Sequence, residues 1–191
     1  MSRTRTFVAV SISPDVINRI KEIVLELSRG VEGVKWVDPE NLHFTLKFLG
    51  DVEDSGLHDV CSAVAAATEG VAPFEVLLAG AGAFPSSTRP RTVWIGAGQG
   101  EEEFAGLHDA VDKALRKLGF RSETRKFTPH VTVGRIRKGN PTLSQLTEHL
   151  KSHASTELGI VPVDEVLVFS SELRPGGPEY HVLGRASLGS L

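Results

Sequence analysis

The chain has 191 residues, of which 40% are hydrophobic and 24% charged, which is the composition of an ordinary globular protein with a substantial core. The formal net charge of -3 excludes a bulk positive field that could hold long nucleic-acid duplexes, so any nucleic-acid contact should be local. The apolar run over 7–12 is too short for a signal peptide or a membrane span, and we expect a cytoplasmic protein without a membrane partner.

The first half of the chain predicts alternating strands and helices. Pro14 is suited to a helix start, and apolar residues then follow helical spacing up to Gly30. The predicted elements are a strand over 7–12, a helix over 14–30, a strand that begins at His43, a helix over 55–68 and a strand over 74–79.

The second half predicts the same order of elements. They are a strand over 93–95, a helix over 101–118, a strand that begins at His130, a helix over 142–155, a strand over 163–169 and a final strand near 180–188. Most of them match the first half at an offset of 87 residues, the difference between 130 and 43. Stretches rich in Gly and Pro at 80–90, 96–100 and 175–178 should be loops.

This repetition predicts an internal duplication, with repeats at about 6–84 and 91–171 inside one two-lobed domain over 1–191. We expect an α+β fold with two antiparallel sheets related by a pseudo-two-fold axis, helices on the outer faces and an active-site groove between the lobes. The sequence leaves open which strands belong to which lobe.

Two short motifs share the pattern His, apolar, Thr, apolar. His-Phe-Thr-Leu begins at His43, and His-Val-Thr-Val begins at His130. Because strand side chains alternate between faces, each motif directs one imidazole and one hydroxyl, from Thr45 or Thr132, to the same side. A single motif of this kind is usually structural, but its repetition at two related positions favours function.

Two opposed imidazoles suit a reaction that takes a proton at one end and gives one at the other. The ordinary histidine pKa near 6.5 lets one ring be neutral while the other is protonated. Opening a cyclic phosphodiester with water needs such a base and such an acid, and the hydroxyls of Thr45 and Thr132 are candidate donors to the phosphoryl oxygens. No metal and no cofactor is required.

Two segments, 38–50 and 127–135, resemble the signatures of the RNA 2′,3′-cyclic phosphodiesterases, also called 2′-5′ RNA ligases, of the two-histidine phosphoesterase superfamily. Segments 7–10, 89–94 and 171–180 also resemble that family. The resemblance implies a bilobal fold, hydrolysis of RNA 2′,3′-cyclic phosphate ends (tRNA halves among them) to 2′-phosphates, and reverse 2′-5′ ligation. It further implies that His43 donates a proton to the leaving 3′ oxygen and that His130 accepts one from water, roles that the two motifs alone do not assign. We expect a monomer.

Several basic and aromatic residues are candidates for substrate contacts. Arg135 follows the second motif, where its guanidinium could reach phosphate oxygens or end in solvent. The basic residues that flank the second motif could attract phosphate or could be ordinary surface charge. We expect one or two of the aromatic rings to stack on a terminal base and the rest to pack in the core. The basic residues are Arg125, Lys126 and Arg137, and the aromatic ones are Trp36, Phe48, Trp94 and Tyr180.

The other histidines are weaker candidates. His58 and His108 should lie on solvated helix faces, and His181 could line the groove. His149 and His153 have the spacing of a helical metal pair but no evident third ligand. Three alternatives remain open: a phosphodiesterase for another cyclic phosphate or a 2′-5′ oligonucleotide, a non-catalytic RNA-end-binding module, and a metal hydrolase.

Overall fold

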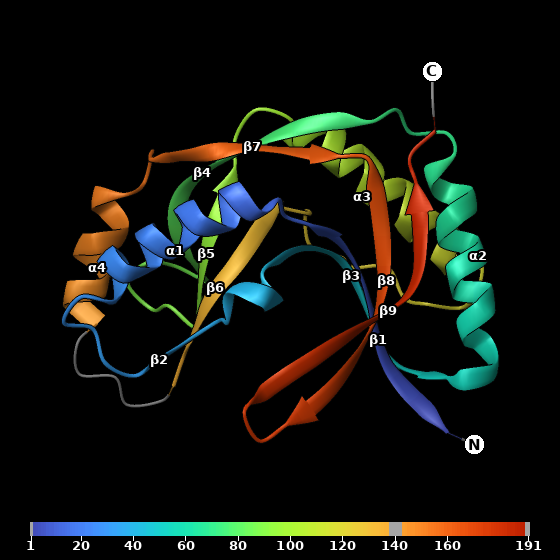
Figure 1. Cartoon of the computed structure of the whole chain (residues 1–191), viewed down its shortest axis with the longest axis horizontal. Coiled ribbons are helices and arrows are strands. Elements are labelled where there is room, and N and C mark those ends of the chain that lie inside the picture. The colour runs from blue at the N-terminus through green and yellow to red at the C-terminus, as the bar shows by residue number, and fades with distance from the viewer. Residues whose placement is uncertain (1, 138–142, 190–191) are drawn as a thin grey trace.

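The computed structural model describes residues 2–137 and 143–189 (Figure 1). The helices are α1 (Pro14–Ser28), α2 (Leu57–Thr68), α3 (Glu101–Arg116) and α4 (Leu143–Ser152), with 3₁₀ turns η1 (Pro39–Asn41) and η2 (Asp54–Gly56). The strands are β1 (Arg3–Ser11), β2 (Val34–Trp36), β3 (His43–Glu53), β4 (Phe74–Phe84), β5 (Thr92–Ala97), β6 (His130–Ile136), β7 (Glu157–Val163), β8 (Glu165–Arg174) and β9 (Gly177–Ser187).

All strand pairs in the described chain are antiparallel, so the predicted α+β class is confirmed. One half of the sheet has the order β9-β8-β1-β3 and the other has the order β6-β5-β4-β7. The two halves meet where Phe44 of β3 pairs with Val131 of β6. The two expected sheets are therefore joined into one curled sheet, and β2 pairs with β6 beside the junction.

The strand order answers the question that the sequence left open. β4, from the first half of the chain, pairs with β5, whereas β8, from the second half, pairs with β1. The two proposed repeats therefore exchange a strand. β4 of the first repeat joins the sheet half of β5 and β6, and β8 of the second repeat joins the half of β1 and β3. Phe44 and Val131 stand 87 residues apart (131 minus 44), and their pairing supports the proposed duplication.

Two details of the strands differ from the predictions. β7 was not predicted as a separate strand, and the predicted strand over 163–169 spans the junction between β7 and β8. Pro162 interrupts the strand pattern there, and β7 tolerates it because it is an edge strand. β4 continues to Phe84, into the predicted loop over 80–90, because its residues 81–84 pair with β5. Gly82 allows this pairing, since a Cβ atom there would stand 2.3 Å from the ring of Trp94. Thr142, the expected start of the fourth helix, lies outside the described residues.

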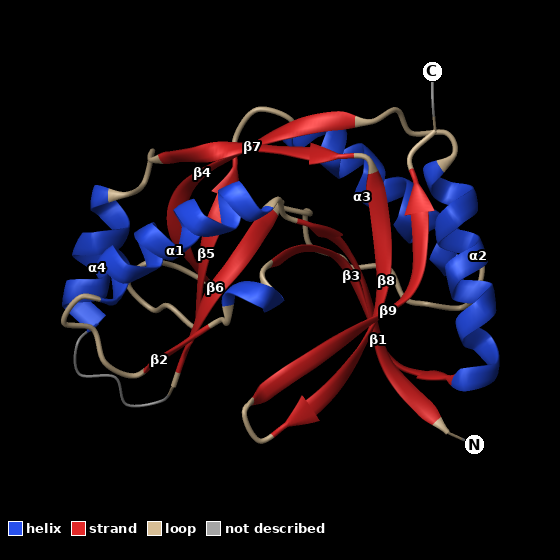
Figure 2. Ribbon diagram, in the orientation of Figure 1, coloured by secondary structure: helices blue, strands red, loops and turns tan. Residues whose placement is uncertain are grey.

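The helices cover the face of the sheet to which Phe44 points. The Phe44 ring lies 4.9 Å from the ring of Phe104 in α3. α1 and α4 pack beside β7 and β4, and α2 and α3 pack beside the half that contains β3, β8 and β9 (Figure 2). The opposite face, to which the neighbours of Phe44 point, is left for a site. No helix in the described part of the chain is long and apolar enough to cross a membrane.

Candidate active site

The pairing of β3 with β6 brings the two motifs together. Around the Phe44–Val131 pair, antiparallel geometry places His43 beside Thr132 and Thr45 beside His130. The two histidines are diagonal neighbours, and such positions in antiparallel strands are about 7–8 Å apart. This spacing leaves room for one small anion between the rings.

Burial alternates along both motifs. The side chains of Phe44 and Val131 are fully buried, and Leu46 and Val133 are also in the core. The two histidines and the two threonines are partly exposed. The apolar residues therefore anchor each strand, while the imidazoles and hydroxyls face the groove.

Both imidazoles are oriented by the same contact. The Nδ1–H of His43 donates to the carbonyl oxygen of Asn41 at 2.7 Å, and the Nδ1–H of His130 donates to that of Thr128 at 2.7 Å. Asn41 and Thr128 are again 87 residues apart (128 minus 41). Because Nδ1 is occupied, Nε2 of each ring is the atom available for proton transfer. Sequence reasoning missed these two carbonyl acceptors, although the repeat offset relates them.

Thr45 contacts the reactive nitrogen of its own motif. Its Oγ1 lies 2.9 Å from Nε2 of His43. When that ring is neutral, the hydroxyl donates to Nε2, and when the ring is protonated, the hydroxyl proton is released for another acceptor. The hydroxyl of Thr45 can therefore turn to a phosphate oxygen when His43 carries its second proton.

Aromatic rings enclose His43. Phe7 and Tyr180 lie 5.0 and 5.5 Å from its ring, measured between centroids. The pKa of His43 is lowered to about 4, chiefly by desolvation in this buried position; the Asn41 carbonyl opposes this shift, and the charge of Arg135 and the neighbouring His130 add to it. In the free protein at neutral pH, this imidazole is uncharged.

His130 has a similar but more open surrounding. Phe84 meets its ring edge-on at 4.9 Å, and Trp94 lies 6.4 Å away. Burial lowers its pKa below the ordinary value, with a smaller contribution from Arg135 in the same direction. Phe7 and Phe84, which were not predicted from the sequence, complete the aromatic walls of the site. Phe7 could have been identified by strand alternation, because it lies on the same face of β1 as Ser11, which pairs with His43.

Arg135 reaches the groove because β6 contains a bulge. Trp94 pairs with Thr132 but Val93 pairs with Gly134, so Val133 is an extra residue in the ladder. The extra residue shifts the alternation by one, and Arg135 then faces the same side as Thr132. Its charge acts on His43, His130 and Tyr180, which places the guanidinium near both imidazoles.

The same bulge follows the first motif. Ala9 pairs with Thr45 and Val8 with Lys47, so Leu46 is the extra residue and Phe48 returns to the groove face. Phe48 is 58% exposed and therefore available for stacking. Where β6 presents Arg135, β3 thus presents an aromatic ring.

A pocket of about 670 Å³ adjoins His43. Tyr180 and Phe169 line it beside His43, and Asp38, Glu40 and Glu179 add carboxylates. Its volume lies within the usual range for small-molecule sites, about 300–1,000 Å³. Of the aromatic candidates, Tyr180, Phe48 and Trp94 lie on the groove face, with Trp94 beside His130, while Trp36 packs against the core.

The remaining histidines lie elsewhere. The prediction that His108 occupies a solvated face is wrong, because its ring is 8% exposed and stacks on Phe127 at 4.1 Å. His58 is exposed as expected. His149 and His153 contact α1 through the Leu27 carbonyl and the Glu26 carboxylate, at 3.1 and 3.0 Å.

One metal-compatible group occurs among the described residues, Glu172, Glu179 and His181, all exposed on the β8–β9 hairpin. Arg174 already pairs with both of its carboxylates, at 2.8 and 3.1 Å. His149 and His153 are not part of this group, and in the described chain they find no third ligand.

Two stretches of the chain, residues 10–94 and 95–180, match the LigT-like phosphoesterase family. A protein of Methanothermobacter thermautotrophicus named RNA 2′,3′-cyclic phosphodiesterase is 39% identical over 178 residues, which are 93% of this chain and 95% of that protein. A protein of the same name from Aquifex aeolicus is 32% identical over 191 residues, 99% of this chain and 100% of that protein.

Solved structures give the same fold. A Thermus thermophilus protein superposes with a TM-score of 0.80 at 28% identity, covering 97% of this chain and 98% of its own. Escherichia coli LigT, crystallised with 3′-AMP, superposes with a TM-score of 0.77 at 21% identity, covering 98% of this chain and 99% of its own. At that lower identity the likeness concerns the fold alone.

Proposed function

The chain belongs to the LigT-like phosphoesterase family, and we propose that it hydrolyses 2′,3′-cyclic phosphates at RNA ends to 2′-phosphates. The observation that carries this proposal is the pair of imidazoles, each held through Nδ1 by a carbonyl, on either side of the Phe44–Val131 junction. The names of the relatives support the same substrate class.

The two histidines divide the proton transfers. Nε2 of His130 takes a proton from water as the water oxygen attacks phosphorus, and the bond from phosphorus to the 3′ oxygen breaks. Nε2 of protonated His43 then gives its proton to the departing 3′ oxygen. His43 is uncharged in the free protein because its pKa is lowered to about 4, so it takes up the proton that it donates when the anionic phosphate binds beside it and raises that pKa.

Three further side chains bind the phosphoryl oxygens in this proposal. The hydroxyls of Thr45 and Thr132 flank the anion from the two strands, and the guanidinium of Arg135 approaches from β6. Donors aimed at developing negative charge in a partly dry site are usually the largest single contribution to catalysis. The terminal base stacks on Phe48 or enters the pocket beside Tyr180.

The wider proposal follows from the same chemistry. A 5′-hydroxyl of a second RNA can take the place of water and attack the same phosphorus. The bond from phosphorus to the 3′ oxygen then breaks, a 2′-5′ bond forms, and tRNA halves are substrates of suitable structure. The reaction needs no metal, because both protons move between imidazoles and oxygen atoms. We place the protein in the cytoplasm, acting as a monomer.

The direct test uses an RNA that ends in a 2′,3′-cyclic phosphate, incubated with protein and a chelator. We expect a 2′-phosphate product, and a loss of roughly 10²–10⁴-fold in rate for His43→Ala and for His130→Ala. His58→Ala, on an exposed helix face, is the matched control and should keep the wild-type rate. Loss of activity with chelator would favour a metal hydrolase, and binding of the RNA end without turnover would favour a binding module.

A further inference from the structure

We propose that the phosphodiester backbone of the RNA, upstream of its cyclic end, lies along three basic residues at the far end of β6: Lys35, Arg135 and Arg137. These three residues are called the basic edge below. The inference rests on the proposed function, since it takes the cyclic end to lie between His43 and His130. It adds the direction in which the rest of the strand leaves the site.

The strand pairing puts the basic edge on the groove face. Lys35 of β2 pairs directly with Arg135 of β6, so the two side chains point to the same side. The backbone N–H of Arg137 donates to the Gly33 carbonyl at 2.8 Å, so the β2–β6 pairing continues two residues beyond Arg135. Arg137 therefore faces the groove, like Arg135. From Thr132 to Arg137 the strand extends roughly 16 Å, enough for phosphates beyond the terminal one.

The charges of the basic edge are available to a ligand. All three side chains are exposed, and no carboxylate of the described chain lies within ion-pair distance of them. Three arginines elsewhere differ in this respect, because Arg3, Arg174 and Arg185 each pair with a glutamate. Unpaired cations in a row that starts at the proposed catalytic groups suit a polyanionic strand.

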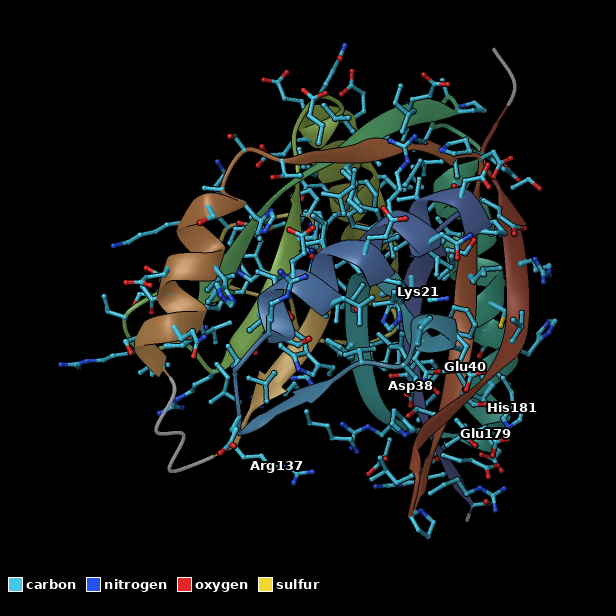
Figure 3. All side chains as sticks on the ribbon, turned by 60° about the vertical axis from the view of Figure 1, so that its left-hand side comes forward. Lys21, Asp38, Glu40, Arg137, Glu179 and His181 are labelled. Carbon is cyan, nitrogen blue, oxygen red and sulfur yellow. The ribbon has the colours of Figure 1, made fainter. Side chains whose placement is uncertain are left out.

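The other side of the site disfavours a backbone. Asp38, Glu40 and Glu179 gather around η1 and β9, apart from Arg137 at the end of the β2–β6 pair (Figure 3). Their carboxylates line the pocket beside His43, together with Arg174, which pairs with Glu179 at 3.1 Å. Asp38 and Glu40 have no ion-pair partner in the described chain, and successive phosphates would meet their like charge there. The pocket therefore suits an uncharged nucleoside, and the strand leaves in the opposite direction.

A second basic segment lies outside the β2–β6 pair. Arg125 and Lys126 lie in the loop between α3 and β6, and the next residue, Phe127, stacks on His108 of α3. Within the same loop, the carbonyl of Arg121 accepts a hydrogen bond from Lys47, whose side chain is buried on the helix-covered side. This loop packs against the helix layer and gives a matched control.

The test compares a 2′,3′-cyclic mononucleotide with a single-stranded oligonucleotide that has the same cyclic end, across a salt series. For single strands, the slope of log affinity against log salt is about -0.7 per phosphate contact, so Lys35→Gln/Arg137→Gln should reduce the slope by about 1.4 for the oligonucleotide. Between 50 and 200 mM salt, that difference is about sevenfold in KM. The KM for the mononucleotide should not change.

The control Arg121→Gln/Arg125→Gln removes two exposed charges from the loop and should leave both slopes as in the wild type. An unchanged oligonucleotide slope in Lys35→Gln/Arg137→Gln, or a reduced slope in the control alone, would overturn the proposed path. Failure of the wild type to open the cyclic mononucleotide and the oligonucleotide alike would instead contradict the proposed function.

Discussion

His43 and His130 are oriented alike but buried differently, and we propose that this difference gives the near-symmetric pair its two roles. Each donates from Nδ1 to the carbonyl two residues earlier in the chain. His43 also contacts Thr45 and lies against Phe7 and Tyr180, whereas His130 meets Phe84 and, further off, Trp94. The sequence predicted that both rings would share a face, but it could not predict this difference, which depends on rings from distant strands.

The lowered pKa values predict the pH profile. A histidine with a lowered pKa is protonated only at lower pH, so both limbs of the kcat/KM profile, which reports the free enzyme, should lie below the ordinary value of 6.5. A bound phosphate raises the pKa of both imidazoles, and the kcat optimum should lie at higher pH than the kcat/KM optimum. Initial rates measured from about pH 3.5 to about pH 9, a range that contains the ordinary histidine pKa, check this. A kcat/KM maximum above pH 7 would argue against it.

The threonines should matter for turnover more than for binding. Thr45→Val and Thr132→Val each remove one hydroxyl donor, and we expect kcat to fall by roughly 10²-fold, with a smaller change in KM. Thr45→Ser keeps the hydroxyl and serves as the control, with most of the rate retained. Steady-state kinetics on the cyclic mononucleotide distinguish the cases. Wild-type kcat in both valine variants would remove the threonines from the mechanism.

The bulge after each motif could not be predicted from the sequence, and it changes which face of the sheet the following side chains occupy. Strict alternation from His130 would direct residue 135 to the core side, with Val131 and Val133. The extra residue at Val133 reverses that direction, and the extra residue at Leu46 does the same for Phe48. The position and charge of Arg135 mark it as a candidate for a phosphate contact, but the direction of its side chain depends on a ladder irregularity that periodicity does not reveal.

The helices were predictable within a few residues because their apolar positions recur at helical spacing. Ile20 and Leu27 of α1 and Leu107 and Val111 of α3 are fully buried. β7 lacked such a signal, since Pro162 lies inside it. The pairing of β4 with β5 and of β8 with β1 could not be predicted either, because it depends on contacts between residues that are far apart in sequence.

Lys47 ties β3 to the loop that leads into β6. Its Nζ donates to Asp112 at 2.5 Å and to the Arg121 carbonyl at 2.7 Å, and its side chain is 2% exposed. Lys47→Met leaves Asp112, only 13% exposed, with the exposed guanidinium of Arg116 at 3.9 Å as its cationic partner. Removing one partner of a buried pair costs about 3–5 kcal/mol, and we expect a loss in the free energy of unfolding near the lower value.

Urea unfolding measures this loss. Lys47→Met/Asp112→Leu removes both charges and should be more stable than the single variant. Equal stability of Lys47→Met and the wild type would show that the pair contributes nothing. Arg185→Met, at an exposed pair with Glu165, is the control and should change stability by less than about 1 kcal/mol.

Across the whole chain, the exchange of β4 and β8 makes each half of the sheet depend on both halves of the sequence. The β3–β6 junction at the centre then fixes one histidine relative to the other. This arrangement supports the proposal that residues 1–191 act as one two-lobed domain. It also explains how the two four-residue motifs, each of a common type, lie together at one candidate site.

The central proposal is that both imidazoles bind the same phosphate. Nitrogen-15 NMR of the histidine rings, followed over pH with and without a 2′-phosphate mononucleotide, measures this directly. We expect one equivalent of ligand to shift the Nε2 signals of His43 and His130 together and to raise the pKa of both, because each gains the same anionic neighbour. A ligand that shifts only one of these two histidines would contradict the shared site.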